Sequence, residues 1–501
     1  MTTSWVLSAE SVWGGDGIIG DTLHIRDGLI EAVTTGGGDA DEHYQGVIVP
    51  RFIDSHFHPF DYIASRTGLS LGTADDMSEV LQRLAEADAD LPEGVALVAD
   101  GFDDSVIGRM PTATELDTVT MDRPIVVHRI CGHVASANTP ALQIAGVVDD
   151  RPDPEAGSFR RDGMGRLTGV FDETAVGMVT AAIGPLTPIP DEETGISILG
   201  ELTSLGIFRI GAMVAMSDTE TDQTDPLHTL RRVGDRLPLA LDVIVITDDP
   251  ADLSRASSLL DGTERSRFWG WKGFADGSLG GRTAALAEPY WDAPDARGTT
   301  RLDGDHALDM TRTSLGLGGV SAIHAIGDAA LANVLDVFAR AIDEGADPRR
   351  LRVEHVSVAS PSLIKRIAEL GVVASVQPSF PVSDSVWLED RLGPERMSRA
   401  YPFTALSASG VPLIFSSDAP VETPDVVAAL SHAVSSGLTP EQALAGYTTT
   451  PRDLLGLGEP FALGSPADFV LLDGPPGKAE SVIGVWANGL RLAGAPRNLG
   501  Q

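Results

Sequence analysis

The sequence predicts an α/β fold built on a (β/α)8 TIM-like barrel, with a small sheet unit formed by both ends of the chain. Eight short apolar segments alternate with helical patterns, polar side chains follow several of these segments, and both chain ends contain short β-like segments. A chain of 501 residues is long enough for one enzyme-sized domain and an accessory domain.

Composition narrows the class of protein. The net charge of −36, from 72 acidic and 36 basic residues, argues against nucleic acid or an anionic membrane as a partner, because phosphate contacts need clustered Lys and Arg. No segment approaches the ~18 apolar residues of a membrane span. The start of the chain does not resemble a signal peptide, and the single cysteine, Cys131, cannot form an internal disulfide. We therefore expect a cytoplasmic protein with a small-molecule substrate; a homo-oligomer is compatible with the sequence.

The two ends of the chain have similar patterns. Short β segments separated by Gly and Asp turns occur in WVLSAESVW, TLHIRDGLIEAVTT and YQGVIV near the start, and in ADFVLLDG and SVIGVWANGLRLAG near the end. We expect residues 1–50 and 461–501 to form one composite antiparallel unit, with two unrelated hairpins as the alternative.

Residues 51–460 are predicted to form the barrel. The eight strand candidates are apolar runs of similar length: VPRFID (from 50), IFRIGAMVA (207), LALDVIVIT (239), WGWKGFAD (269), GVSAIHAIGD (319), LRVEHVSV (351), VVASVQPS (372) and PLIFSSDAP (412). Helical patterns such as 329–345 and 361–371 fill the intervals, the second opened by Pro. The first interval is far longer than one crossover needs, so about 60–190 should be an inserted α+β subdomain that lies over the barrel mouth.

Six polar side chains lie near the ends of these apolar runs. His56 and His58 are two residues apart, so both should leave the same face of an extended strand. Active residues of such barrels gather at the C-terminal ends of the strands, and Zn²⁺ accepts imidazole and carboxylate ligands. We therefore expect one metal site, with one or two ions, formed by the following residues: His56, His58, Lys272, His324, His355 and Asp418.

The chemical form of Lys272 indicates whether the site holds one ion or two. A protonated lysine would be repelled by metal ions, and its burial is costly. If its neutral amine takes up CO₂, the resulting carbamate is an anionic ligand able to bridge two metals, which we expect to be Zn. A Schiff base is the alternative, but it would not explain the surrounding ligands.

These residues could catalyse a hydrolysis. Two cations would lower the pKa of a shared hydroxide and polarise a carbonyl group. Asp418 would accept the proton of the attacking water and pass it to the leaving nitrogen. Hydrolysis of an amide, formamide or cyclic amide would follow this path, although Asp418 could instead cap a following helix.

Substrate contacts are less specific in the sequence. His128 and His133 lie in the insertion, where a pocket contact and a structural role are about equally expected. Trp387 suggests an apolar or aromatic substituent on the substrate, and core packing would explain it equally well.

Several motifs together resemble the metal-dependent amidohydrolase superfamily, and more closely its branch of N-substituted formamide deformylases. The matching motifs are FIDSHFHP, GHVASANTPAL, WKGFADGSLGGRTAAL, HAIGDAA, RVEHVSV, FSSDAPVETP, LTPEQALAGYTTTPRDLLG and GSPADFVLLD. The resemblance implies a (β/α)8 barrel with a β-sandwich made from both termini. It also implies metal ligands at the four histidines and at carbamylated Lys272, with Asp418 as the catalytic acid and base. Asp276 and Arg282 match the branch and are expected in the pocket wall.

Three other functions remain open. A mononuclear deaminase on this scaffold would carry His-x-x-Glu near His324, where the sequence reads HAIGDAALA, and Lys272 would have no role. A phosphotriester or lactone hydrolase could use the same two-metal site. A non-catalytic binding protein should have lost ligands, and none of the expected ligands is missing.

Overall fold

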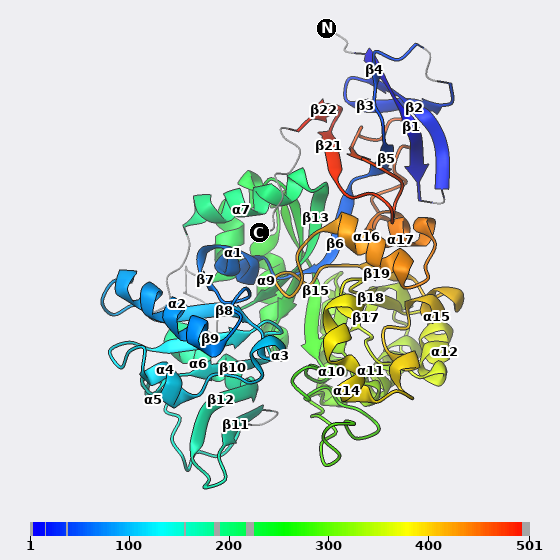
Figure 1. The fold of residues 1–501 in the computed structure, drawn as a ribbon. Coiled ribbons are helices and arrows are strands. Elements are labelled where there is room, and N and C mark those ends of the chain that lie inside the picture. Colours follow the sequence, from blue (N-terminus) through cyan, green and yellow to red (C-terminus); the bar gives the residue numbers. More distant parts are fainter. Residues whose placement is uncertain are drawn as a thin grey trace.

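A barrel of eight parallel strands forms the centre of the protein. The computed structural model describes residues 4–15, 17–36, 39–154, 157–184, 191–216 and 225–492. The strands, in chain order, are β6 (Phe52–Phe57), β13 (Ile207–Ala215), β14 (Ala240–Ile246), β15 (Ser266–Phe274), β16 (Val320–Ala325), β17 (Leu351–His355), β18 (Val373–Val376) and β19 (Leu413–Phe415). Each pairs in parallel with its chain neighbour, so the predicted fold class is confirmed (Figure 1).

The barrel closes where its last strand returns to its first. The amide N–H of Asp418 donates to the carbonyl oxygen of His56 at 2.9 Å, and that of His58 donates to Ala419 at 2.9 Å. The Ser417 hydroxyl donates to the Asp54 carboxylate at 2.5 Å. These bonds place the segment after β19 against the end of β6, which brings residues from opposite ends of the barrel sequence together.

Helices cover the outside of the barrel. They are α1 (Pro59–Thr67), α7 (Glu192–Ser204), α8 (Pro226–Val233), α9 (Pro250–Leu260), α10 (Gly304–Gly316), α11 (Asp328–Asp343), α12 (Pro361–Leu370), α15 (Phe403–Ala408), α16 (Val426–Ser435), α17 (Pro440–Tyr447) and α18 (Thr449–Leu454). Two shorter helices, α13 (Phe380–Ser383) and α14 (Leu388–Leu392), follow β18. Because both faces of the parallel sheet are covered, β6, β16 and β17 are buried at every residue.

Local sequence explains the limits of α12. The Ser360 side chain accepts a hydrogen bond from the amide of Leu363, and Pro361 occupies the first turn, where no amide donor is needed. Gly371 ends the helix with φ 71°, a left-handed conformation that glycine adopts without strain. The helix predicted for 361–371 from its opening Pro and closing Gly is confirmed.

The long first interval contains a separate sheet with its own helices. The strands are β7 (Leu69–Ser70), β8 (Leu97–Phe102), β9 (Ile125–Arg129), β10 (Val134–Ala137), β11 (Gly157–Arg161) and β12 (Leu167–Glu173), in the order β11-β12-β10-β9-β8-β7. The helices are α2 (Met77–Asp90), α3 (Asp104–Ile107), α4 (Ala113–Asp117), α5 (Thr139–Ile144) and α6 (Thr174–Ile183). Two apolar clusters pack within this insertion, one of them around Phe171 and Val179.

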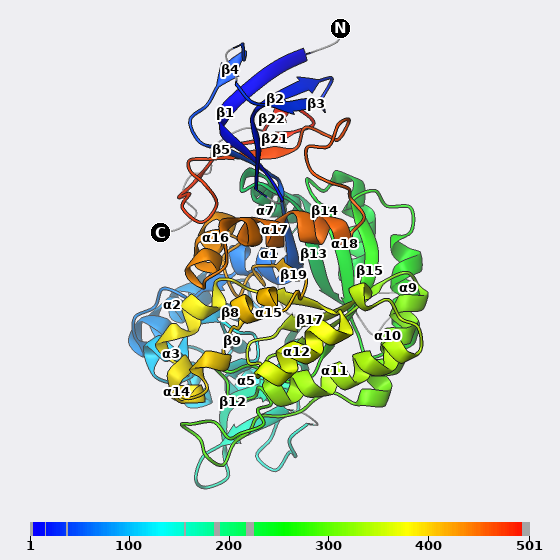
Figure 2. The same ribbon diagram turned by 90° about the vertical axis from the view of Figure 1, so that its right-hand side faces the viewer.

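Strands from both ends of the chain share a third sheet. Its members are β1 (Ser4–Gly14), β2 (Gly17–Arg26), β3 (Leu29–Thr34), β4 (Glu42–His43), β5 (Val47–Pro50), β20 (Phe469–Leu472), β21 (Val482–Ala487) and β22 (Leu490–Arg491). The expected all-antiparallel pairing is wrong in one respect, because β1 pairs in parallel with β4 and β5. Figures 1 and 2 show this terminal sheet at one end of the molecule and the insertion at the other.

The domain limits 1–50, 51–460 and 461–501, with an insertion at about 60–190, stay a prediction, as do the cytoplasmic location and a homo-oligomer. Within the described residues, we find no helix with the length and apolar character needed to cross a bilayer.

Candidate metal centre

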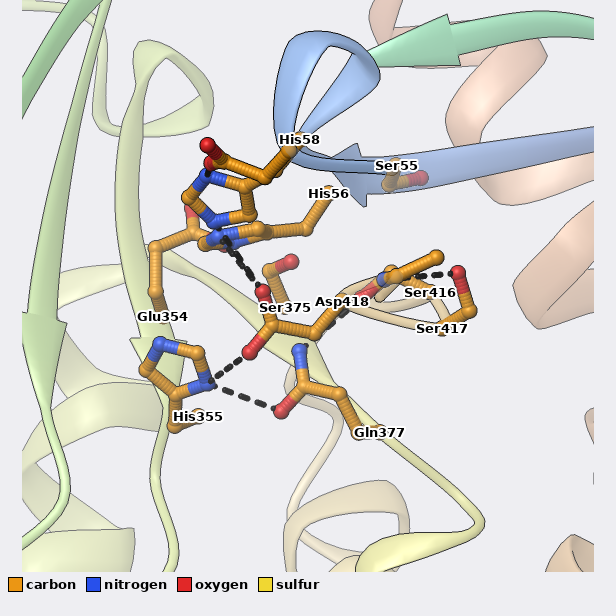
Figure 3. A network of polar contacts seen from close by, with 12 residues as sticks. Ser55, His56, His58, Glu354, His355, Ser375, Gln377, Ser416, Ser417 and Asp418 are labelled. Carbon is orange, nitrogen blue, oxygen red and sulfur yellow. Dashed lines mark hydrogen bonds and ion pairs between the residues drawn. The ribbon is translucent and has the colours of Figure 1, made fainter. Parts of the chain in front are cut away.

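His56, His58 and Asp418 meet at the mouth of the barrel. Oδ1 of Asp418 lies 3.3 Å from Nε2 of His56 and 3.2 Å from Nε2 of His58. One donor atom from each of the three residues lies within 4.8 Å of the others, which is close enough to surround one ion. Figure 3 shows the two imidazoles and the carboxylate turned toward one another.

Backbone geometry explains how His56 and His58 reach the same place. His56 lies in β6, and His58 directly follows the strand as the residue before α1. The two ring centroids are 5.4 Å apart. The His-x-His spacing therefore places both rings on the interior side of the barrel.

His355 and His324 continue the cluster along the mouth. The centroid of the His355 ring lies 5.1 Å from that of His56 and 4.6 Å from that of His324. Nδ1 of His355 lies 3.9 Å from Oδ2 of Asp418. Burial holds the pKa of both His324 and His355 well below the usual histidine range, so both rings are neutral, as metal ligands must be.

Lys272 is on β15 and is nearly completely buried at 2% exposure. Its ammonium nitrogen lies 4.0 Å from the ring centroid of Phe274, two residues further along the same strand face. Burial lowers the pKa of Lys272 to about 8, although Glu354 and Asp418 oppose this shift. The amine is therefore much more often neutral near pH 7 than an exposed lysine would be.

The buried carboxylate of Glu354 positions His56. Its Oε2 lies 2.7 Å from Nδ1 of His56, and its Oε1 accepts a hydrogen bond from Nε of Arg352 at 2.9 Å. Burial alone would raise the pKa of Glu354, but Arg352 and His56 hold it well below its usual range. The anionic Glu354 keeps a proton on Nδ1 of His56 and leaves Nε2 free to face Asp418.

The other ring nitrogens are held in the same way. Nδ1 of His355 lies 3.0 Å from Oε1 of Gln377, and Nε2 of His324 lies 3.0 Å from the carbonyl oxygen of Gly277. Nδ1 of His58 lies 3.4 Å from the Asp61 carboxylate. Metal-binding histidines usually donate their second N–H to such an acceptor, so this pattern fits a metal site.

Two positions in the cluster have a left-handed backbone. His355 has φ 76° and Asp418 has φ 59°, which costs a non-glycine residue on the order of 1–3 kcal/mol. In a regular strand, Glu354 and His355 would point to opposite faces. The turn at His355 allows both side chains to reach the site, because the chain leaves the β conformation there.

Three histidines around Asp418 favour its ionised form. Burial would raise its pKa, but His56, His58 and His355 hold the pKa of Asp418 well below its usual range. Asp418 and Asp61 in turn raise the pKa of His58 to about 9 against the effect of burial, so a metal ion bound at His58 would have to displace a proton. Asp418 does not cap the next helix, because the side chain that caps α16 belongs to Asp425.

Unsatisfied polar atoms provide a test of whether these residues fit a metal. His56 Nε2 and Asp418 Oδ1 are both buried, and neither has a hydrogen-bond partner within the described part of the chain. Buried polar atoms are nearly always paired, and two facing acceptors without partners fit a cation held between them. The donor set of imidazole nitrogens and a carboxylate oxygen suits a divalent ion such as Zn²⁺.

The expected wall residues make mostly structural contacts. The buried carboxylate of Asp276 accepts hydrogen bonds from the backbone amides of three residues: Ala285, Ile326 and Gly327. Arg282 is paired with Asp292 at 2.7 Å. These bonds tie the loop after β15 to the start of α11, and a direct substrate contact by either residue stays a prediction.

The remaining candidates lie in different surroundings. Nδ1 of His128 is 2.9 Å from Asp100, and its Nε2 is 3.1 Å from the Thr180 hydroxyl, so both ring nitrogens are used within the insertion. Trp387 precedes α14 and packs with Arg391. His133, by contrast, has its ring centroid 5.4 Å from that of His324.

Sequence reasoning did not identify Glu354, Gln377 or Asp54. Each is a polar residue within a strand segment that alternates with apolar residues, at RVEHVSV, VASVQPS and FIDSHFHP, and a polar residue expected to be buried there was an available signal. Periodicity could not show that Glu354 faces the same side as His355.

The comparisons with known proteins agree with this geometry. Residues 45–492 match the amidohydrolase family. The chain belongs to this family. This amidohydrolase is 30% identical over 400 residues to YtcJ of Bacillus subtilis (strain 168), a match that covers 79% of this chain and 74% of YtcJ. The resemblance inferred from the motifs is confirmed.

Two further proteins extend the comparison across nearly the whole amidohydrolase chain. An N-substituted formamide deformylase of Arthrobacter pascens is 24% identical over 468 residues, covering 86% of this chain and 84% of the deformylase. The solved structure of an uncharacterized metal-dependent hydrolase from Pyrococcus horikoshii OT3 is similar at a TM-score of 0.70 and 26% identity, covering 94% and 97% of the two chains.

Proposed function

We propose that this amidohydrolase is a metal-dependent hydrolase that cleaves a C–N bond other than a peptide bond in a small molecule: an amide, formamide or cyclic amide. The observation that carries the proposal is the pair of unsatisfied atoms, His56 Nε2 and Asp418 Oδ1, facing each other beside three further imidazoles. The similarity to an N-substituted formamide deformylase supports the choice of bond.

We further propose two zinc ions. His56, His58 and Asp418 would hold one ion, His324 and His355 would hold the other, and Lys272 would bridge them as a carbamate. The low pKa of Lys272, about 8, supports the carbamate because only the neutral amine takes up CO₂. When bound, the ions supply positive charge that makes water more acidic and polarises a carbonyl group.

The protein's own residues would move the protons. Asp418 is held ionised, so its carboxylate can accept a proton from the attacking water and return it to the leaving nitrogen. Glu354 and Gln377 keep His56 and His355 in fixed orientations throughout, because each accepts from Nδ1 of its partner.

Substrate screening with defined metal content tests the proposal. The purified full chain, loaded with zinc and supplied with bicarbonate, should hydrolyse at least one compound in a panel of N-alkylformamides, N-acyl amines and cyclic amides. A chelator should abolish this activity, and zinc should restore it. Turnover of a phosphotriester or lactone alone, or ammonia release from an aminopyrimidine alone, would replace the proposed reaction with one of those chemistries.

Metal analysis tests the number of ions separately. Mass spectrometry of active, dialysed protein should give about two zinc ions per chain. A value below one would contradict the two-metal proposal. In protein supplied with carbon-13 bicarbonate, a carbon-13 carbamate signal on Lys272 is expected.

A further inference from the structure

One imidazole beside the proposed centre comes from the insertion and is outside the ligand set. His133 lies in the turn between β9 and β10, and its ring is tilted by 49° against that of His324 at a centroid distance of 5.4 Å. At this place a residue of the insertion lies against a barrel histidine.

Glu173 fixes the orientation of His133. Oε2 of Glu173 lies 3.0 Å from Nδ1 of His133, and the Glu173 amide donates to the carbonyl oxygen of His133 at 2.9 Å. The same Oε2 accepts a hydrogen bond from Nη1 of Arg301 at 3.0 Å. The Glu173 side chain is only 2% exposed, so this pairing takes place out of contact with bulk water.

The loop after β15 leaves room for this carboxylate. A Cβ atom at Gly277 would lie 2.1 Å from Oε1 of Glu173 and 2.3 Å from Oγ1 of Thr283. Glu173 itself has φ 56°, a strained conformation for a residue with a side chain. Both features show that the barrel loop and the insertion are built to bring Glu173 to this position.

The arrangement determines which nitrogen of His133 is left to accept a further hydrogen bond. A carboxylate at Nδ1 keeps the proton on that nitrogen, so Nε2 carries a lone pair and accepts hydrogen bonds. Nε2 has no hydrogen-bond partner in the described ranges of the chain, and the side chain is 19% exposed. Both ring nitrogens of His128, in the preceding strand, are used instead.

We propose that Nε2 of His133 accepts a hydrogen bond from the N–H of the substrate amide, so that the enzyme selects N-monosubstituted amides and formamides over N,N-disubstituted ones. This proposal rests on the proposed function, because it assigns a substrate group to the same mouth. Glu173 is a positioning residue that acts through His133, and Arg301 holds Glu173.

A matched substrate pair tests the selection. N-phenethylformamide and N-methyl-N-phenethylformamide differ only in the hydrogen or methyl group on the nitrogen, and kcat/KM for each should be measured with the zinc-loaded full chain. We expect the wild type to prefer the first compound by at least about ten-fold, as expected for one buried hydrogen bond. In His133→Phe this ratio should fall to near one while zinc content stays unchanged. An exposed control, His306→Phe on α10, should keep the wild-type ratio.

Two outcomes overturn the proposal: a wild type without preference, or a His133→Phe variant that keeps it. If neither compound is hydrolysed, the proposed hydrolysis of N-substituted formamides is wrong. Calorimetric titration with the same two compounds then tests whether His133 recognises the N–H group. Stronger binding of the N–H compound that is lost in His133→Phe supports the proposal, and equal or absent binding of both overturns it.

Nitrogen-15 NMR of histidine-labelled protein gives a readout independent of turnover. The resonances lost in His133→Phe should show a proton on Nδ1 and none on Nε2 in the ligand-free wild type. The opposite tautomer would overturn the proposal.

Discussion

At the scale of single residues, the site depends on acceptors that hold one nitrogen of each imidazole. Glu354, Gln377 and the Gly277 carbonyl oxygen each bind a different ring, and Glu173 does the same for His133. Fixing one nitrogen fixes both the tautomer and the ring plane, so the other nitrogen is presented without further ordering.

Replacing Asp418 by Asn should remove the proton acceptor. The amide keeps the shape of the side chain but cannot take up a proton, so turnover should fall by about 10² or more. Rates measured at equal zinc occupancy check this, with Asp305→Asn, an exposed helix residue, as the control. Unchanged turnover would remove Asp418 from the mechanism.

Replacing Glu354 by Gln should weaken metal binding without touching a proposed ligand. The neutral amide no longer enforces a proton on Nδ1 of His56 and leaves Arg352 without its anionic partner. We expect zinc affinity to fall by roughly 10–100-fold. Competition against a coloured chelator measures this, and Glu369→Gln at an exposed ion pair provides the control. Equal affinities would show that His56 needs no such support.

At the scale of elements, the sequence predicted the barrel well because each strand is a local apolar run. The segments starting at 207 and 351 became β13 and β17, since buried parallel strands are apolar on both faces. The histidines could also be placed, because strand ends meet at one mouth.

What periodicity could not supply is the geometry where strands end. The left-handed turn at His355, with φ 76°, lets His355 reach the site beside Glu354, and no alternation pattern contains that information. The pairing of His133 with Glu173 was equally hidden, because it joins two residues 40 positions apart through the fold of the insertion.

Adding one methyl group at Gly277 should disturb the contact between the insertion and the loop after β15 and destabilise the protein. In Gly277→Ala, the new Cβ would overlap Glu173 Oε1 at 2.1 Å, so the carboxylate must move. We expect a loss of about 1–3 kcal/mol in the free energy of unfolding, as for other overpacked sites.

A glycine with free space provides the matched control. Gly177 is within α6, and a Cβ there meets nothing within 4 Å, so Gly177→Ala should be neutral or stabilising by up to about 1 kcal/mol. Urea unfolding of both variants makes the comparison. Equal stabilities of Gly277→Ala and the wild type would show that the contact is loose.

At the scale of the whole molecule, net charge opposes compactness. A charge of −36 on one folded chain produces repulsion over distances longer than its ion pairs span. Ion pairs at contact distance are screened less by salt than this long-range repulsion.

The melting temperature should therefore rise with ionic strength. Increasing NaCl from about 0.01 M to about 0.3 M shortens the screening length from ~30 Å to below ~10 Å, which weakens the repulsion first. Scanning fluorimetry across this range at constant pH measures the effect. A melting temperature that falls with salt would show that attractive pairs dominate the surface energy.

The terminal sheet also limits the order in which the chain can fold during synthesis. β5 ends at Pro50, just before the first barrel strand, and its antiparallel partner β20 begins at Phe469. During translation, more than 400 further residues must therefore be synthesised before β20 can pair with β5, which takes on the order of a minute at common elongation rates. Until then the edge of β5 that faces β20 has no partner, although β1 is already available for its other edge, so nascent chains should depend on chaperones that shield an open strand edge.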